Sequence, residues 1–215
     1  MVIMVFKEIY DISILLGKED VCYPGDAPFS REIVSSIQKG AAYVLSNVAL
    51  SSHAGTHIDA PAHFLKGGKT VDQYAAKDFV FFAHVVEIKD KESIEPKGLQ
   101  NLEINNGDAL LFKTMNSMSG LSTSGSFSEK FVYMSEGAAH RCVDLKVGLV
   151  GMDYLSVDRC SDEAAPAHRI LLESDIMILE NINLREVPEG EYTLFCPPLK
   201  IKDAEASPVR AMLLR

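Results

Sequence analysis

Three of the six histidines in the chain fall within eleven residues, in the segment Ser51–Phe64, SSHAGTHIDAPAHF. His53, His57, Asp59 and His63 follow the spacing H-x3-H-x-D-x3-H. Imidazole nitrogens and carboxylate oxygens are the ligands of borderline divalent ions such as Zn²⁺ and Mn²⁺. The segment therefore predicts a metal site. The competing interpretation is a chance grouping of core or surface histidines.

The local conformation expected for this segment is extended. Gly55 and Pro61 both disfavour a helix here. In an extended chain, the period of two points the first two histidines and the aspartate to one face. Gly55 lies between the histidines on that face and is expected to leave room for an ion or a substrate. Pro61 is expected to bend the chain, so that His63 returns toward the site from the other side.

A Ser-His-Asp triad is an alternative use of the same segment, with Ser51 or Ser52 as the nucleophile. The chain has no GxSxG nucleophile elbow. A triad also leaves the additional histidines without a role. The metal site is therefore the preferred interpretation.

The string HAGTHIDAPAHF resembles the signature of the metal-dependent cyclase/hydrolase family, whose members include bacterial kynurenine formamidases and isatin hydrolases. The resemblance extends along nearly the whole chain. It continues in CYPGDAPF (22–29), GMDYLSVD (151–158), AHRILLESDIMILENI (167–182) and PPLKIKDAEASPVRAML (197–213). It implies the swivelling β/β/α type of fold, an α/β architecture whose mixed sheet has barrel character.

The resemblance also implies roles for the residues of the motif. His53, His57 and Asp59 match metal ligands, and Asp59 matches the carboxylate that bridges to a second ion. His63 matches the catalytic residue that donates and accepts a proton. Two divalent ions are implied, with zinc preferred over manganese.

Two later residues complete the implied ligand set. His168 matches the ligand of the second ion, and Glu180, twelve residues later, matches a carboxylate that bridges both ions. Spacing alone would make His168 a helix-surface residue and Glu180 a solvated strand end. Tyr23 stands just before Pro-Gly-Asp, where formamidase members place an aromatic residue, typically tryptophan, against the substrate ring. This chain has no tryptophan, so Tyr23 is the implied substrate-binding residue.

The implied activity is hydrolysis of N-formylkynurenine to kynurenine and formate. Two bound divalent ions lower the pKa of a water from 15.7 toward about 7, which makes hydroxide available for attack on an amide carbonyl. One alternative is hydrolysis of another small cyclic amide or lactone, such as an isatin-like compound, with a single Mn or Zn ion. A second alternative is a metal-binding protein without catalysis.

The rest of the composition limits partners and compartment. The net charge is −9, and no cluster of Lys and Arg is present, which argues against a nucleic-acid or membrane partner and leaves a small-molecule substrate. No secretory or membrane-spanning segment is visible, and the four cysteines show no CxxC spacing, so a cytoplasmic protein with free thiols is expected. The 215 residues are expected to form one domain, 1–215. The apolar composition and the resemblance predict a homodimer or homotetramer.

Strands outnumber helices among the elements expected to position the site. Strands are predicted at Glu32–Ile37, Tyr43–Ser51, Phe79–Ile88, Ala109–Lys113, Phe131–Met134, Val147–Gly151, Ile176–Glu180, Tyr192–Cys196 and Val209–Leu213. Helices are predicted at Glu136–Leu145 with Ser135 as N-cap, from Pro166 to about Glu173, and at Glu95–Leu102. The Ser/Gly-rich segment Asn116–Ser128 is expected to be a flexible loop.

Several polar residues outside the ligand set are expected to be structural. His84 lies in a predicted strand and His140 on a predicted helix. Asp26 is expected to shape a turn. Arg169 is expected either to brace a carboxylate near the site or to form a surface ion pair. Asp153 and Asp158 are assigned no role.

Overall fold

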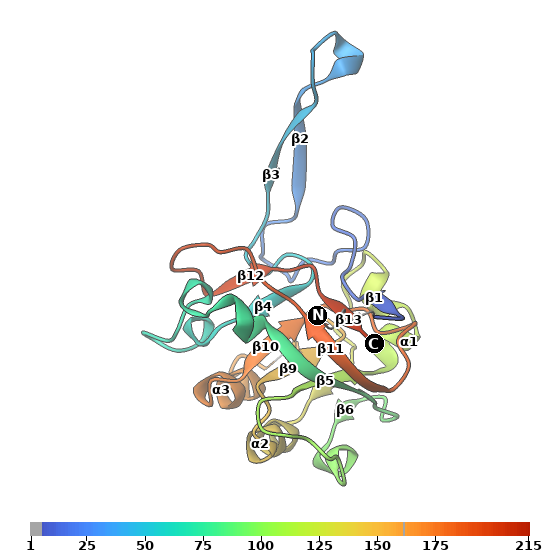
Figure 1. Ribbon diagram of the computed structural model, residues 1–215, viewed down its shortest axis with the longest axis vertical. Coiled ribbons are helices and arrows are strands. Elements are labelled where there is room, and N and C mark those ends of the chain that lie inside the picture. The colour runs from blue at the N-terminus through green and yellow to red at the C-terminus, as the bar shows by residue number, and fades with distance from the viewer. Residues whose placement is uncertain (1–5, 161) are drawn as a thin grey trace, which may run out of the picture.

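The computed structural model describes residues 6–160 and 162–215, and its main feature is a nine-stranded mixed sheet that curls into a half-barrel (Figure 1). The strand order is β1-β13-β11-β5-β7-β9-β10-β4-β12. The strands are β1 Ile9–Asp11, β4 His57–Asp59, β5 Val80–Glu87, β7 Ala109–Lys113, β9 Leu149–Met152, β10 Met177–Glu180, β11 Gly190–Phe195, β12 Ala206–Pro208 and β13 Met212–Leu214. The four central strands, from β5 to β10, pair in parallel, and the others are antiparallel. The expected α/β architecture with barrel character is confirmed.

Two helices cover one face of the sheet (Figure 1). In α2, Glu136–Leu145, the hydroxyl of Ser135 accepts a hydrogen bond from Ala138 N and caps the first turn. Pro166 is the first residue of α3, Pro166–Glu173, where its fixed φ suits a helix start. Both helices are found where the sequence predicts them.

The central strands are buried on both faces because the sheet separates two apolar cores. In β7, Ala109 and Leu111 belong to the core inside the half-barrel. Leu110 and Phe112 belong to the core between the sheet and the two helices. This alternation explains why such strands appear in the sequence as nearly continuous apolar runs. The same alternation in β10 decides which of its side chains face the two helices and which face the inside of the half-barrel.

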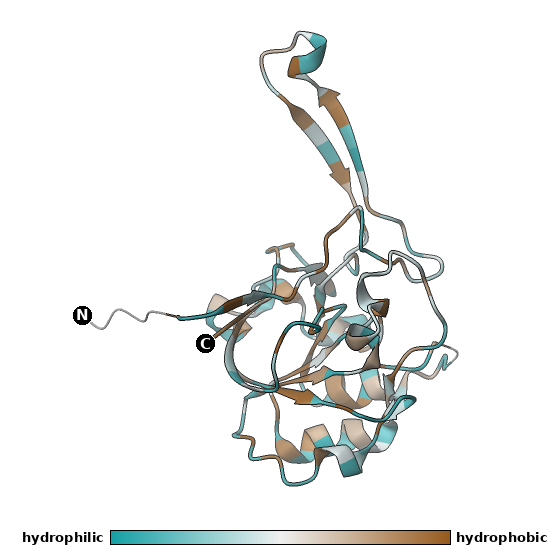
Figure 2. Ribbon diagram, turned by 90° about the vertical axis from the view of Figure 1, so that its right-hand side faces the viewer, coloured by the Kyte–Doolittle hydropathy of each residue, from teal (hydrophilic) through white to brown (hydrophobic). Residues whose placement is uncertain are grey.

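A hairpin arm projects from the body of the molecule (Figure 1). It consists of β2, Ser30–Ser35, and β3, Leu45–Ala49, with a short 3-10 turn, Ile37–Lys39, near its tip. Hydrophobic residues lie along both strands of the arm (Figure 2). Within the described part of the chain, β2 and β3 pair only with each other. A two-stranded hairpin of this kind is marginally stable in water without further packing.

Two element predictions are wrong. Glu95–Leu102 forms only a 3-10 turn, Pro96–Leu99, because Pro96 and Gly98 within four residues suit a turn better than a helix. Residues 116–128 are not simply a loop, since they contain most of the short helix α1, Met115–Met118, and a 3-10 turn, Leu121–Thr123. Asn116, Ser117 and Ser122 are buried beside Asp153, whereas Ser119, Ser124 and Ser126 face solvent.

The short strands are the elements that the sequence does not reveal. They are β1, β12 and the two-residue β6, Ser93–Ile94, whereas its partner β8, Tyr133–Met134, lies within the predicted strand Phe131–Met134, and β4 lies in the segment predicted to be extended. Strands of two or three residues carry too little alternation to be recognised. In residues 6–160 and 162–215, no helix has the length and apolar character needed to cross a membrane.

Candidate metal centre

The pairing register between β4 and β10 brings the first ligands together. The two strands are antiparallel, with His57 opposite Glu180 and Asp59 opposite Ile178. Directly opposed residues point to the same face of a sheet. That face is the one covered by α3, because Ile178 belongs to the core beneath the helices. The expected period of two therefore holds for His57 and Asp59.

The stretch before β4 differs from the expectation, because residues 52–56 form turns and not an extended strand. Gly55 has a φ of +65°, a left-handed conformation that favours glycine. A Cβ at this position would lie 2.6 Å from Leu16 Cδ2 and not in the site. Gly55 therefore makes the turn that returns His53 to the cluster and leaves no space for an ion.

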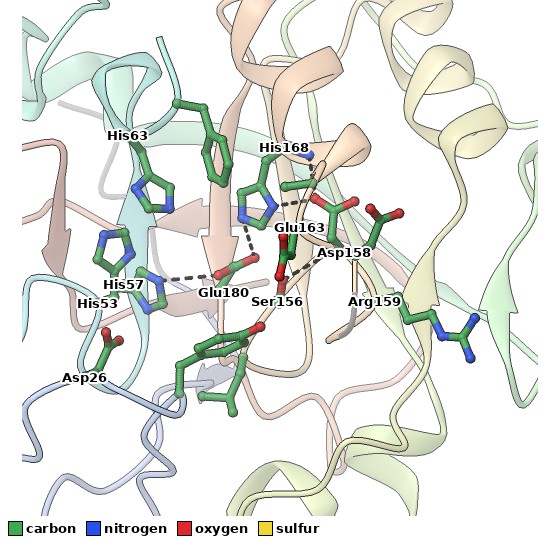
Figure 3. A pocket seen from close by; sticks show the side chains of 15 residues that line it. Asp26, His53, His57, His63, Ser156, Asp158, Arg159, Glu163, His168 and Glu180 are labelled. Atoms are coloured by element: carbon green, nitrogen blue, oxygen red, sulfur yellow. Dashed lines mark hydrogen bonds and ion pairs between the residues drawn. The ribbon is translucent and has the colours of Figure 1, made fainter. Parts of the chain in front are cut away.

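Two carboxylates, Asp59 and Glu180, stand between the imidazoles of the cluster, and Figure 3 shows Glu180 between His57 and His168. Asp59 Oδ1 lies 3.0 Å from His53 Nδ1 and 3.5 Å from His57 Nε2, whereas Asp59 Oδ2 lies 3.7 Å from His168 Nε2. Glu180 Oε2 lies 3.4 Å from His57 Nε2, and Glu180 Oε1 lies 3.3 Å from His168 Nε2. Each carboxylate thus turns one oxygen toward each side of the cluster, which is the arrangement of a bridging ligand.

The ring nitrogens that face away from the cluster have acceptors of their own. His57 Nδ1 lies 2.8 Å from the Gly55 carbonyl oxygen, and His168 Nδ1 lies 2.6 Å from Asp158 Oδ2. His53 Nε2 lies 3.5 Å from Glu205 Oε1. Such outer partners fix the tautomer and ring orientation of metal-binding histidines. They leave His53 Nδ1, His57 Nε2 and His168 Nε2 free to face an ion.

Asp158 and Glu205 are the functional residues that the sequence reasoning missed. Asp158 also accepts hydrogen bonds from the backbone amides of Ala167 and His168, at the N-terminus of α3. Glu205 precedes β12, which pairs with β4, and its carboxylate accepts a hydrogen bond from Ser52. The only sequence signal for either residue was its place in a segment that resembles the family, 151–158 for Asp158 and 197–213 for Glu205.

The residues present fit a divalent ion. His57 Nε2 and both carboxylate oxygens of Asp59 are buried and have no hydrogen bond of normal geometry among the described residues. Buried polar atoms are normally paired, so three such atoms around one point indicate a missing positive ligand. One ligand atom each from His53, His57 and Asp59 lies within 4.8 Å of the others, and so does one each from Asp59, His63 and His168.

The protonation equilibria show how strongly the cluster attracts positive charge. Burial alone would raise the pKa of Asp59, but the imidazoles of His57, His168 and His53 hold that pKa well below its usual range. Burial opposes protonation of His53, but Asp59, Glu180 and Glu205 outweigh it and raise its pKa to about 9. In the metal-free protein, protonated imidazole therefore balances the charge of carboxylates that stay ionised and are arranged to bind a cation.

His63 differs from the other three histidines of the cluster. It ends the 3-10 turn Pro61–His63, as the expected bend at Pro61 requires, and its ring centroid lies 4.2 Å from that of His53. Burial, followed by the nearby imidazoles of His53 and His168, lowers its pKa against the attraction of Asp59 and Glu180. His63 is therefore neutral near pH 7 and able to accept a proton.

The cluster forms one end of a cavity of about 310 Å³ (Figure 3). Tyr23 lines this cavity, and its hydroxyl donates a hydrogen bond to the carbonyl oxygen of Cys160. The backbone amide of Asp26 donates a hydrogen bond to the Tyr23 carbonyl oxygen, which forms the expected turn. Asp26 also lines the cavity. Phe64, which stacks on the ring of His168, adds an aromatic wall.

The two histidines expected to be structural, His84 and His140, have partners outside the cluster. His84 Nε2 lies 2.9 Å from Asp108, and the exposed His140 lies 3.9 Å from Glu136. Arg169 neither braces a carboxylate nor forms an ion pair with a described residue, since its Nε donates to the Ala164 carbonyl oxygen. All four cysteines, Cys22, Cys142, Cys160 and Cys196, are free thiols.

Solved structures with the same fold include hydrolases. A predicted metal-dependent hydrolase from Bacillus stearothermophilus matches with a TM-score of 0.82 and 28% identity, covering 96% of this chain and 98% of the other. Isatin hydrolase A from Labrenzia aggregata matches with a TM-score of 0.80 and 21% identity, covering 96% and 93%, which shows a shared fold. The half-barrel and its buried cluster of histidines and carboxylates thus define a metal-dependent hydrolase.

Sequence comparison then identifies the family. The family model described as "Putative cyclase" matches residues 10–159. The kynurenine formamidase of a Bacillus cereus strain is 34% identical over 207 residues, which cover 96% of this chain and 97% of the relative. The chain belongs to the putative cyclase family.

Proposed function

We propose that this chain hydrolyses N-formylkynurenine, an aryl formamide, to kynurenine and formate. The observation that carries the proposal is the cluster of buried, unpaired ligand atoms at one end of the cavity. Whole-length similarity to proteins named kynurenine formamidase supports the choice of substrate.

The proposed cofactor is a pair of divalent ions, zinc in preference to manganese. His53, His57 and Asp59 would hold one ion, and His168, Asp59 and Glu180 the other. The two-sided geometry of Asp59 and Glu180 supports two ions over one. When bound, the ions supply Lewis acidity and lower the pKa of a water to about 7.

The remaining steps belong to the side chains. His63 is neutral at pH 7 and lies beside the cluster, so its imidazole can accept a proton from the attacking water and pass it to the leaving aryl amine. Tyr23 and Phe64 line the cavity and offer aromatic surfaces for the aryl ring.

Turnover of N-formylkynurenine by metal-loaded protein, followed through kynurenine absorbance, tests the proposal. We expect His57→Ala to abolish turnover, whereas His140→Ala, which changes an exposed histidine outside the cluster, keeps it. Metal analysis of the active protein is expected to give about two ions per chain. Absence of turnover above the His57→Ala background would reject this substrate.

The competing proposal is hydrolysis of a cyclic amide such as isatin, since isatin hydrolase A shares the fold. It predicts faster turnover of isatin than of the formamide, with about one ion per chain. A non-catalytic metal protein predicts turnover of neither compound and a melting temperature that falls on chelation.

We infer further that the chain assembles with copies of itself through the hairpin arm, as a dimer or tetramer. Seven large apolar side chains of the arm are each about half exposed: Ile33, Val34, Ile37, Tyr43, Val44, Leu45 and Val48. Exposed apolar side chains that gather on one projecting element mark an interaction surface on a soluble protein. Packing against a second copy supplies the burial that an isolated hairpin lacks.

Light scattering during size-exclusion chromatography tests this assembly. We expect an oligomer in the wild type and dissociation in Val44→Asp. Val80→Asp is the matched control, because Val80 is also an exposed valine, 44% against 53% for Val44, but lies on β5 in the body. A monomeric wild type, or a Val44→Asp protein of unchanged mass, contradicts the inference.

A further inference from the structure

The cavity that holds the metal cluster has a second polar end. Besides the cluster, its lining includes Arg159, Glu163, Asp162 and Asp26. Figure 3 shows Arg159 on the opposite side of the cavity from His53 and His57, beyond Asp158. A molecule that reaches the cluster with one group can therefore present other groups to this end.

Arg159 has a charge that the protein itself does not use. Its guanidinium forms no ion pair with any described residue, although carboxylates lie nearby in the sequence. The neighbouring Asp158 is already engaged by His168 and by the N-terminus of α3. Arg159 also borders a hollow that contains Glu92 and Glu129, and it pairs with neither. Arg159 is an exposed residue of the lining, and Figure 3 shows its guanidinium on the outer side, away from the cluster. A guanidinium without a partner at this end suits a carboxylate, which it can bind with two parallel hydrogen bonds.

Glu163 offers the complementary charge. Asp162 accepts a hydrogen bond from Ala164 N, whereas the carboxylate of Glu163 makes no hydrogen bond or ion pair with a described residue. Glu163 lines the same cavity, and Figure 3 places it on the side of Asp158 and His168. A free carboxylate and a free guanidinium on the lining of one cavity are the two charges that an α-amino acid group requires.

We propose that Arg159 binds the carboxylate, and Glu163 the ammonium group, of a substrate that carries an α-amino acid side chain. The inference rests on the proposed function, and it narrows the substrate class to aryl formamides that bear a zwitterionic head. Neutral anilides and lactams such as isatin lack both charges and gain nothing from this end of the cavity.

Three formamides that differ in one charge at a time test the proposal. The first is N-formylkynurenine, the second its desamino analogue, which keeps the carboxylate, and the third N-(2-acetylphenyl)formamide, which is neutral. We expect Arg159→Gln to lower kcat/KM about 10- to 100-fold for the first two, mainly through KM, and to leave the neutral compound unchanged. Glu163→Gln is expected to lower kcat/KM only for N-formylkynurenine.

Arg185→Gln is the matched control, because Arg185 is exposed and lies outside the cavity. Equal effects of Arg159→Gln on all three compounds, or no effect on any, overturn the proposed subsite while the formamidase function stands. Failure of the wild type to hydrolyse any of the three overturns the proposed function and the subsite with it. Thermal melts of each variant with and without zinc separate a binding defect from misfolding.

Discussion

The two halves of the metal cluster are built with different rigidity. His168 and Glu180 are almost fully buried, with side chains 7% and 3% exposed, and both are held from behind by short hydrogen bonds. His53 is 19% exposed and lies in a turn, and its outer partner Glu205 is 40% exposed and 3.5 Å away. A helix and a strand position His168 and Glu180, and strand β4 positions His57 and Asp59, whereas a turn positions His53. The half with His168 is therefore fixed by the fold, whereas the other half contains one ligand, His53, that can adjust to what enters the cavity.

The largest expected effect comes from removing the residue that both halves share. Asp59→Asn keeps the shape of the side chain but removes the charge that faces His53 and His168. We expect loss of both ions and a fall in kcat/KM on the order of 10³-fold or more. Metal analysis and formamide turnover on the same sample measure it. Retention of one ion per chain would show that the halves bind independently and that Asp59 does not link them.

A smaller effect is expected from substitution of the outer partners, and the loss of metal affinity should differ between the two halves of the cluster. Asp158→Asn removes the charge behind His168 and is expected to weaken metal binding about 10- to 100-fold. Glu205→Gln changes a longer and more exposed contact, so a loss below about 10-fold is expected. Competition with a chromophoric chelator measures both affinities. Equal losses of metal affinity in the two variants would contradict the difference in rigidity between the two halves of the cluster.

The smallest expected effect is a pH dependence confined to the metal-free protein. The pKa of His53 is raised to about 9, so its protonation stabilises the metal-free fold. That contribution is complete below the ordinary pKa of about 6.5 and disappears as the pH rises through about 9. We therefore expect the melting temperature of the metal-free protein to fall over this range.

Zinc-loaded protein should lack this decline, because an ion then takes the place of the proton at His53. Melting curves at pH 6, 7.5 and 9, with and without zinc, provide the measurement. The same pH slope in both forms would mean that His53 does not face the ion.

Parts of the fold and site were predictable because their signals are local. Ser135 and Pro166 mark helix starts through capping and fixed φ, and both helices lie where these residues place them. The pairing of His57 with Glu180 was not predictable from spacing, because it depends on a strand register set across more than a hundred residues. Only the resemblance to a family connected the two.

The hairpin arm shows a different limit of sequence reasoning. Leu45 and Val48 lie in β3 and Val44 directly precedes it, and composition alone does not distinguish this apolar stretch from a core strand. The structure places all three about half exposed. An apolar pattern indicates that the side chains require burial, but it does not indicate whether the same chain or another copy covers them.

The arm also has a consequence for the life of a newly made chain. Both outer edges of the β2–β3 ribbon carry unpaired backbone groups within the described part of the chain, next to apolar side chains. Free edges of this kind are templates for indiscriminate strand addition and aggregation. Arg31 and Glu32 place opposite charges on neighbouring positions of β2, and such gatekeepers disfavour unspecific pairing. The window between synthesis and assembly is then the period in which this protein is most vulnerable to aggregation.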